Sequence, residues 1–154
     1  MLLSLDQFVF SLTTAPFHEL KRRRNWKHPK KSRIGVRDAR QYTGQGDDVI
    51  TLDGLIAPDQ IGTSASLDQL VQMANVGEAY VLVDGLGTVY GAYIIVGLDE
   101  TRRYFTREGA ARRIEFTLTL ECVDDDALRI EQEASLANES DGDAEAETET
   151  ETKA

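Results

Sequence analysis

The chain has 154 residues, with 17 Lys and Arg against 27 Asp and Glu, which gives a formal net charge of −10. This length is typical of one domain and excludes two large hydrophobic cores. Residues 124–154 hold twelve acidic and two basic residues and so carry the whole net charge, whereas residues 1–123 hold fifteen of each sign. A neutral body with separate charged segments favours a docking protein over an enzyme.

The charge distribution predicts two parts, a single β-rich domain over residues 1–123 and an acidic, low-complexity extension over residues 124–154. From Leu136 onward we expect disorder, because so few large apolar side chains cannot offset the entropy cost of ordering. No apolar run approaches the roughly 18 residues needed to span a bilayer. The single Cys122 excludes an intrachain disulfide, which fits a cytosolic origin.

The first 40 residues predict one strand followed by an irregular basic segment. Residues 2–12 are rich in Leu, Phe and Val, with Phe8, Phe10 and Leu12 expected on one face of a strand. Residues 18–40 form a basic arm, which holds ten Lys and Arg against two acidic residues. Its few large apolar residues form no continuous stripe, so we expect residues 21–40 to be a surface loop or extended arm.

The middle of the chain predicts a hairpin and then a helix. Residues 41–55 are a hairpin candidate with a turn over residues 44–48, and Asp53 and Gly54 give a second turn signal. Residues 66–76 predict the helix, with Ser66 and Gln69 as a capping box and Gly77 as its end. The expected apolar face of this helix consists of Leu67, Leu70, Val71 and Ala74.

The remaining elements are predicted strands. Residues 79–83 and 88–96 flank a turn over residues 84–87, and Gly91 indicates a bulge or a close backbone approach. After a turn over residues 108–110, apolar and polar residues alternate over residues 114–122, which is typical of a half-buried strand. The prediction is an α+β fold, mostly antiparallel β-sheet as a sandwich or partly closed barrel, with one amphipathic helix packed on it.

The sequence predicts no catalytic, cofactor or metal site. His18 and His28 are ten residues apart and have no Cys, His or carboxylate at ligand spacing. Cys122 falls on the inward face of the last predicted strand, and Gly85 and Gly87 are better explained by a hairpin turn than by a phosphate loop. We therefore expect no enzyme activity, because catalysis requires a convergent set of groups.

The basic arm is the strongest candidate for a binding site. The candidate partner-binding residues are Lys21, Arg22, Arg23, Arg24, Trp26, Lys27, His28, Lys30, Lys31 and Arg33. Residues 21–40 could bind nucleic acid, with the cations on phosphates and Trp26 stacked on a base. The arm could equally dock on protein, where Arg and Trp are frequent hot-spot residues, and composition alone does not separate these two hypotheses. A loose contact with the acidic extension is a third.

Short motifs along residues 1–123 resemble the GpU family, tail protein U of Peduovirus-type phages and its relatives in prophages and R-type tailocins. The strongest match is Leu82 to Gly85 followed by Gly87 and residues 89–91, and a second covers Arg112 to Leu120. The other matching stretches are residues 1–5, 8–12, 19–20, 26–28, 44–46, 50–54, 58, 62 and 67–74. Tyr93 departs from a position where the family often has Trp, a basic residue common near Glu121 is absent, and the acidic extension lies outside the match.

The resemblance implies a non-enzymatic part of a contractile tail, which is made in the cytoplasm of the bacterial host. The similar tailocin protein is called the ripcord, and this implies a place at the baseplate and central hub, near the base of the inner tube, and a role in releasing the baseplate. Implied partners are the hub, the inner tube, and sheath-initiator or baseplate subunits. The resemblance also implies multiple copies around a symmetric axis. On this basis nucleic acid is not an expected partner, and neither is a membrane.

Overall fold

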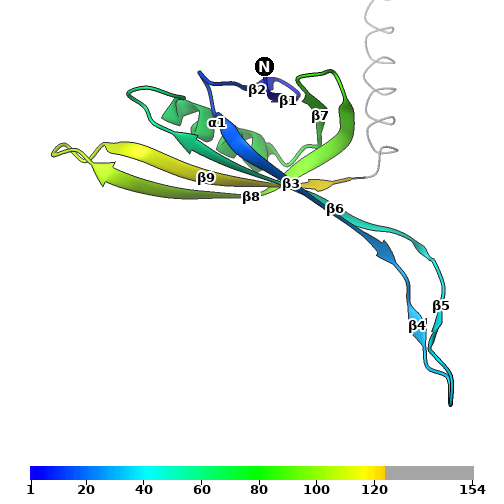
Figure 1. The fold of residues 1–154 in the computed structure, drawn as a ribbon. Coiled ribbons are helices and arrows are strands. Elements are labelled where there is room, and N and C mark those ends of the chain that lie inside the picture. The colour runs from blue at the N-terminus through cyan, green and yellow to red at the C-terminus, as the bar shows by residue number, and fades with distance from the viewer. Residues whose placement is uncertain (124–154) are drawn as a thin grey trace, which may run out of the picture. The chain divides into compact units, whose positions relative to one another are not determined.

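The protein was analysed as a computed structural model that describes residues 1–123, so the expected extension over residues 124–154 lies outside the described residues. One sheet has the strand order β2-β1-β7-β8-β9-β6-β3, and a small second sheet pairs β4 with β5 (Figure 1). The elements are β1 (Leu3–Leu5), β2 (Phe8–Phe10), β3 (Phe17–Lys27), β4 (Lys30–Lys31), β5 (Ala39–Arg40), β6 (Gly44–Ile56), α1 (Ser64–Val76), β7 (Tyr80–Asp84), β8 (Val89–Phe105) and β9 (Ala111–Cys122).

Strand β9, an interior strand of the sheet, confirms the alternation seen in the sequence. Ile114, Phe116, Leu118 and Leu120 are buried, and the residues between them are more exposed. Cys122 is half-buried and packs against the same core. The buried side chains of β1, β2, β6, β7 and α1 complete one hydrophobic core. The described residues therefore bury one face of the sheet in a single core.

The N-terminal segment is a hairpin rather than the single predicted strand. Strands β1 and β2 pair antiparallel, and the chain reverses at Asp6, whose φ of 51° lies in the left-handed region. Asp is one of the few residues other than Gly that adopts this conformation readily. Phe8 and Phe10 are buried as expected, but Leu12 follows the hairpin and is 68% exposed.

Of the two alternatives expected for residues 21–40, a surface loop or an extended arm, the loop is wrong in its first part, because β3 continues to Lys27 and pairs with β6. The predicted turns at residues 44–48 and at Asp53 and Gly54 are also wrong, since both lie within β6. Gly54 is needed for close packing rather than for a turn. A Cβ at this position would collide with the ring of Phe116 and the carbonyl oxygen of Pro16.

Helix α1 is confirmed, but its predicted start is wrong. The helix begins at Ser64 after Thr63, so Ser66 lies within its first turn and cannot form the predicted capping box with Gln69. The Thr63 hydroxyl donates to the carbonyl of Thr13 instead of capping the helix. Gly77 ends the helix in the left-handed conformation, with φ 74°, as predicted.

One face of α1 covers the sheet. Leu67 and Leu70 are buried, and the helix contacts β8. Val71, which was expected on the same face, is 40% exposed. The buried stripe is therefore narrower than the sequence pattern predicted.

Strands β7 and β8 form the predicted hairpin, with residues 85–88 connecting them. The bulge expected at Gly91 is confirmed, because Leu82 pairs with Gly91 and the next residue, Val83, pairs with Val89. Strand β8 continues well beyond Val96 and reaches Phe105, paired throughout with β9. This continuation produces a long hairpin that the sequence did not predict.

The sheet is curled but open. Its hydrogen-bonded order leaves β2 and β3 as the two edges, so it is a single sheet rather than the predicted sandwich. Strand pairing does not close it into a full barrel, which the other expectation, a partly closed barrel, did not require. The edges nevertheless approach each other on the core side, where the rings of Phe10 and Phe17 pack edge to face with centroids 6.0 Å apart. The mostly antiparallel α+β class is confirmed.

Candidate docking surface

A two-stranded ribbon projects from the sheet where β9 ends. Strand β9 pairs with β6 only as far as Val49, opposite Glu121, and beyond this point β3 and β6 continue alone. We call residues 24–48, which include β4, β5 and the turn between them, the ribbon. Figure 1 shows the ribbon leaving the body at the end opposite to the β8–β9 hairpin.

An irregularity in strand pairing marks the root of the ribbon. Arg24 pairs with Asp48 and Trp26 pairs with Gln45, so Asn25 stands opposite two residues of β6. Gly46 is one of these two, and a Cβ there would collide with the side chain of Asn25. Such irregularities increase twist and bend the strand pair. Gly46 therefore permits the ribbon to turn away from the sheet.

Arg22 and Asp48 connect β3 to β6 at the root of the ribbon. Nε of Arg22 donates to Oδ1 of Asp48 over 2.9 Å, and a terminal guanidinium nitrogen binds Oδ2 of the same carboxylate. The hydroxyl of buried Tyr93 donates to Oδ2 over 3.2 Å, and the guanidinium lies 5.3 Å from the ring centroid of Tyr90. The hydrogen bonds from Arg22 lower the pKa of the Asp48 carboxyl, and burial raises the pKa of Tyr93.

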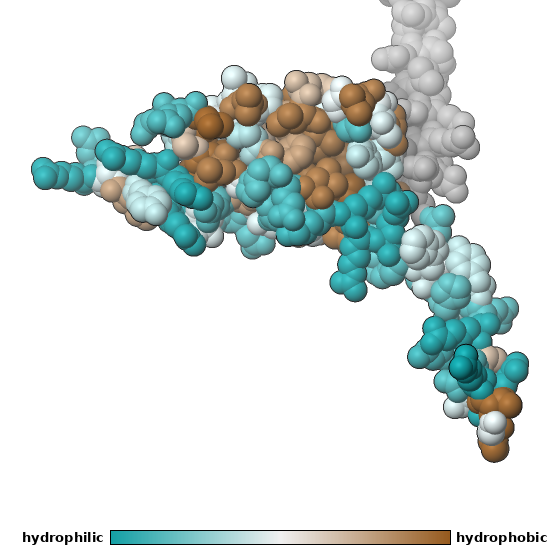
Figure 2. Space-filling view, viewed as in Figure 1, coloured by the Kyte–Doolittle hydropathy of each residue, from teal (hydrophilic) through white to brown (hydrophobic). Residues whose placement is uncertain are grey.

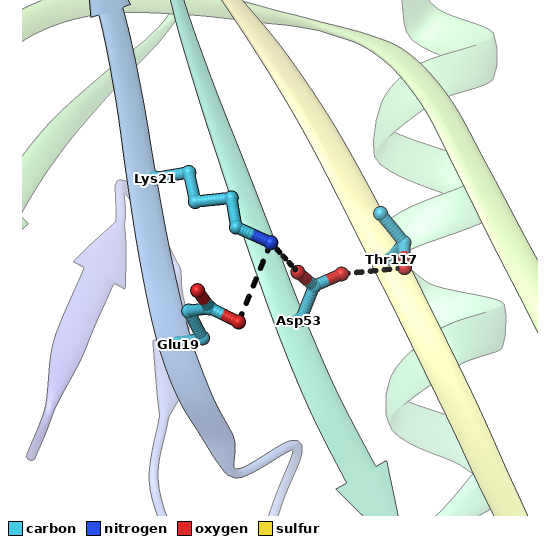
Figure 3. Close-up of polar contacts among 4 residues, drawn as sticks. All are labelled: Glu19, Lys21, Asp53 and Thr117. Atoms are coloured by element: carbon cyan, nitrogen blue, oxygen red, sulfur yellow. Dashed lines mark hydrogen bonds and ion pairs between the residues drawn. The ribbon is translucent and has the colours of Figure 1, made fainter.

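Lys21 has partners on the other face of the same strands (Figure 3). Its ammonium group lies 3.2 Å from Oδ2 of Asp53 and 3.4 Å from a carboxylate oxygen of Glu19. The Thr117 hydroxyl donates to Oδ1 of Asp53 over 2.7 Å. Hydrogen bonding to Asp53 raises the pKa of Lys21, and the bond from Thr117 lowers the pKa of Asp53. The charges of Lys21 and Arg22 are therefore already paired with carboxylates within the sheet.

The remaining predicted cations are exposed and unpaired within the described part of the chain. No ion pair to another described residue involves Arg23, Arg24, Lys27, Lys30, Lys31, Arg33, Arg37 or Arg40. Between residues 27 and 43 the sequence has six Lys and Arg and a single acidic residue, Asp38. We call residues 27–43 the distal ribbon. It is a positively charged surface whose cations form no ion pair with another described residue, which is suited to an acidic partner.

Aromatic and apolar side chains accompany this charge. Trp26 is 55% exposed, and the ring of His28 lies 5.3 Å from that of Tyr42 on the opposite strand. Ile34 and Val36 are exposed in the turn at the far end of the ribbon. Figure 2 shows the ribbon as mostly hydrophilic with a hydrophobic end. The combination of cations with exposed aromatic and aliphatic groups is typical of a protein-docking surface.

The β8–β9 hairpin is a second exposed projection that the sequence analysis missed. Tyr104 and Phe105 are 69% and 61% exposed at its end, and Tyr104 has a φ of 59°. Five arginines surround them, namely Arg102, Arg103, Arg107, Arg112 and Arg113. Three of these pair with Glu100 or Glu115, so this hairpin is less cationic than the ribbon. The Arg-rich sequence around these two aromatic residues is the signal that could have identified this hairpin as a candidate binding surface.

Residues 1–123 contain no group of three or more His, Cys, Asp or Glu side chains placed to hold a metal ion. None of the helices in this part of the chain is long and apolar enough to cross a membrane.

A curled antiparallel sheet with one helix and a projecting ribbon defines the described residues as a small β-rich domain with exposed charged projections. The chain matches the model of the family described as Phage P2 GpU over residues 6–125. This match covers more than half of the chain, and the chain belongs to that family of phage tail proteins. The resemblance noted in the sequence is thereby confirmed.

Comparisons with known proteins agree with the family. The chain is 32% identical over 123 residues to a probable tape measure protein of Halomonas phage phiHAP-1. The match covers 79% of this chain but only 14% of that protein, so the chain spans about one seventh of its relative. Two solved structures share the fold at 15% identity and a TM-score of 0.51, covering 80% of this chain and 90% of theirs. They are chains from the tail of an empty gene transfer agent particle with C6 symmetry and from the virion of a native gene transfer agent.

Proposed function

We propose that the protein is a structural subunit of a contractile phage or tailocin tail, placed at the baseplate and central hub near the base of the inner tube. There it acts in tail assembly and in release of the baseplate on contraction. It performs no catalysis. The observation that carries this proposal is the ribbon, whose cations form no ion pair with another described residue, in a chain of the GpU family.

The proposed partners are other tail proteins, namely the hub, the inner tube, and sheath-initiator or baseplate subunits. In the Halomonas phage relative, a segment similar to this chain is one seventh of a protein named as a probable tape measure protein. That arrangement supports a position beside the central components of the tail. The C6 symmetry named for one structural neighbour supports multiple copies around the tail axis.

We also propose a division of labour along the chain. Residues 1–123 form the tail-protein domain, and residues 124–154 are an acidic extension that the fold does not require. The cationic residues of the distal ribbon and Trp26 bind an acidic face of a neighbouring tail subunit. Lys21 and Arg22 support this surface from below because both have carboxylate partners within the sheet.

Charge reversal at the distal ribbon tests this function. The variant Lys30→Glu, Lys31→Glu and Arg33→Glu changes exposed residues, so we expect an unchanged unfolding midpoint together with failure to enter tail particles. A matched control reverses three arginines of the other projection, Arg103, Arg107 and Arg112. Normal incorporation of the ribbon variant into fully active particles would show that the ribbon is not the docking surface.

Binding of nucleic acid through residues 21–40 is the second candidate function. It is favoured by the six cations between residues 27 and 43 beside exposed Trp26. This function predicts DNA binding that weakens steeply as salt rises, because bound phosphates release their counterions. Filter-binding titrations of the wild-type chain at two salt concentrations decide it. The absence of binding at low salt, or a flat salt dependence, removes this candidate.

A further inference from the structure

A hollow of about 330 Å³ lies between α1 and the β1–β2 turn. Its lining is mixed: Asp6 and Glu78 supply carboxylates, three glutamines supply neutral amides, and Met73, Val76 and Tyr80 supply apolar surface. Val76 is 62% exposed although it belongs to a helix that otherwise packs on the sheet. The hollow therefore combines negative charge with uncovered apolar groups.

The end of α1 adds to the negative potential of this hollow. The helix closes at Gly77, beside Glu78, and its last turn contains no basic residue. Because backbone carbonyl groups at a helix C-terminus carry partial negative charge, a cation is favoured there. Asp6 and Glu78 also contribute to raising the pKa of Tyr80, after the larger effect of burial. Within the described residues, no ion pair neutralises either carboxylate.

The end of the ribbon has the complementary composition. Ile34 and Val36 lie on either side of Gly35, and Arg33 and Arg37 lie outside them in the sequence. All four side chains are exposed. The side chain of Ile34 is fully exposed and that of Val36 is 64% exposed. Two cations beside two aliphatic side chains complement a hollow whose lining includes two carboxylates together with Met73 and Val76.

The two surfaces cannot meet within one chain. Ile34 lies eight residues further along the chain than Trp26, which is at the root of the ribbon, and this is a span of roughly 26 Å at strand spacing. The ribbon is a hydrogen-bonded strand pair that leads away from the body (Figure 1). Folding it back onto α1 would require breaking this ladder, so within the described residues the end of the ribbon does not reach the hollow of its own molecule.

We propose that the end of the ribbon of one copy, residues 33–37, docks into the hollow beside α1 of a second copy. Each molecule offers a different surface to each neighbour, so the contact is head-to-tail and can repeat around an axis. Arg33 and Arg37 face Glu78 and Asp6, and Ile34 and Val36 cover Met73 and Val76. This inference rests on the proposed function only in requiring several copies side by side in the tail.

A photo-crosslinking residue in place of Ile34 tests the contact. In the purified full-length chain at high concentration and low salt, and again in assembled particles, the expected product is a dimer. Peptide mass spectrometry of this dimer should place the crosslink within residues 72–78 of the second copy. A crosslink to another protein, a crosslink elsewhere on the second copy, or no dimer in either preparation would overturn the proposal.

Charge variants supply the second arm of the test. Gln72→Lys with Glu78→Lys makes the hollow basic through two exposed positions and leaves the left-handed Asp6 in place. We expect at least about a tenfold loss of crosslinked dimer, and the same loss from Arg33→Glu with Arg37→Glu. Mixing the two variants should restore the dimer, since each acidic surface then meets a basic one. Glu108→Lys is the control at a distant exposed site.

The failure of this inference and that of the proposed function give different results. Wild-type protein that is present in tails but shows no Ile34 crosslink to the hollow overturns the contact alone. Wild-type protein that is absent from tails overturns the proposed function, whatever the purified chain does.

Discussion

Arg22 and Asp48 form a two-point ion pair across β3 and β6, at the place where the ribbon leaves the sheet. Their side chains are only 24% and 18% exposed, and Tyr93 from the core donates a third hydrogen bond to the same carboxylate. The pair links the core to the base of the projection. We therefore expect this ion pair to contribute mainly to the stability of the fold rather than to a docking surface.

We expect Asp48→Asn to lower the free energy of unfolding by about 1–3 kcal/mol, because the part-buried guanidinium of Arg22 loses its charged acceptor. Urea unfolding followed by circular dichroism measures this change. Asp47→Asn is the matched control, since Asp47 is an exposed neighbour and such changes stay within about 0.5 kcal/mol. Equal effects of the two substitutions would mean that the pair contributes nothing measurable.

The same carboxylate gives a pH dependence. Its folded pKa lies below the ordinary value of 3.8, so the unfolded chain takes up the proton first as the pH falls. The contribution of Asp48 is therefore fully present above about pH 5 and is lost as the pH falls through 3.8 toward the folded pKa. Urea unfolding between pH 6 and about pH 2.5 should show the difference between wild type and Asp48→Asn shrinking. A difference that stays constant with pH contradicts this assignment.

Gly54→Ala should destabilise the protein by about 1–3 kcal/mol, because the new methyl group enters space held by Phe116 and the carbonyl of Pro16. Gly97→Ala is the control in β8, where the nearest atom, on Thr119, lies 4.0 Å from the added Cβ. Thermal unfolding of both variants measures the contrast. Should Gly54→Ala be no worse than Gly97→Ala, the close approach at Gly54 is not required.

A chain that ends after Val123 should unfold at the same urea concentration as the full chain, since the buried hydrophobic residues of the described core lie between Leu3 and Leu120. Incorporation of this truncated chain into particles should also be unchanged. Loss of assembly with an unchanged unfolding midpoint would show instead that residues 124–154 order on a basic partner.

Elements with one buried face were predictable from the sequence. In β9 the alternation from Ile114 to Leu120 gave the strand and its orientation, and Gly77 gave the end of the helix. The start of the helix was not predictable from Ser66 and Gln69, because Thr63 and the preceding segment determine it through contacts distant in sequence.

The ribbon could not be identified as strands because neither of its faces is buried. Residues 23–33 are exposed on both sides of the strand pair, so the sequence has no alternation for a pattern to detect. The same applies to the outer part of β8, from Glu100 to Phe105. The sequence did identify the cationic composition of the arm, but only the fold separates Lys21 and Arg22, which have carboxylate partners, from the exposed cations beyond them.

The central claim, a place at the baseplate end of a contractile tail, is tested most directly by immunogold electron microscopy of particles from the source bacterium. The account predicts gold confined to the baseplate end, visible after detergent or contraction has exposed buried sites. Particles that remain unlabelled after both treatments would contradict it, and would leave a transient assembly factor or a DNA-binding protein as the explanation.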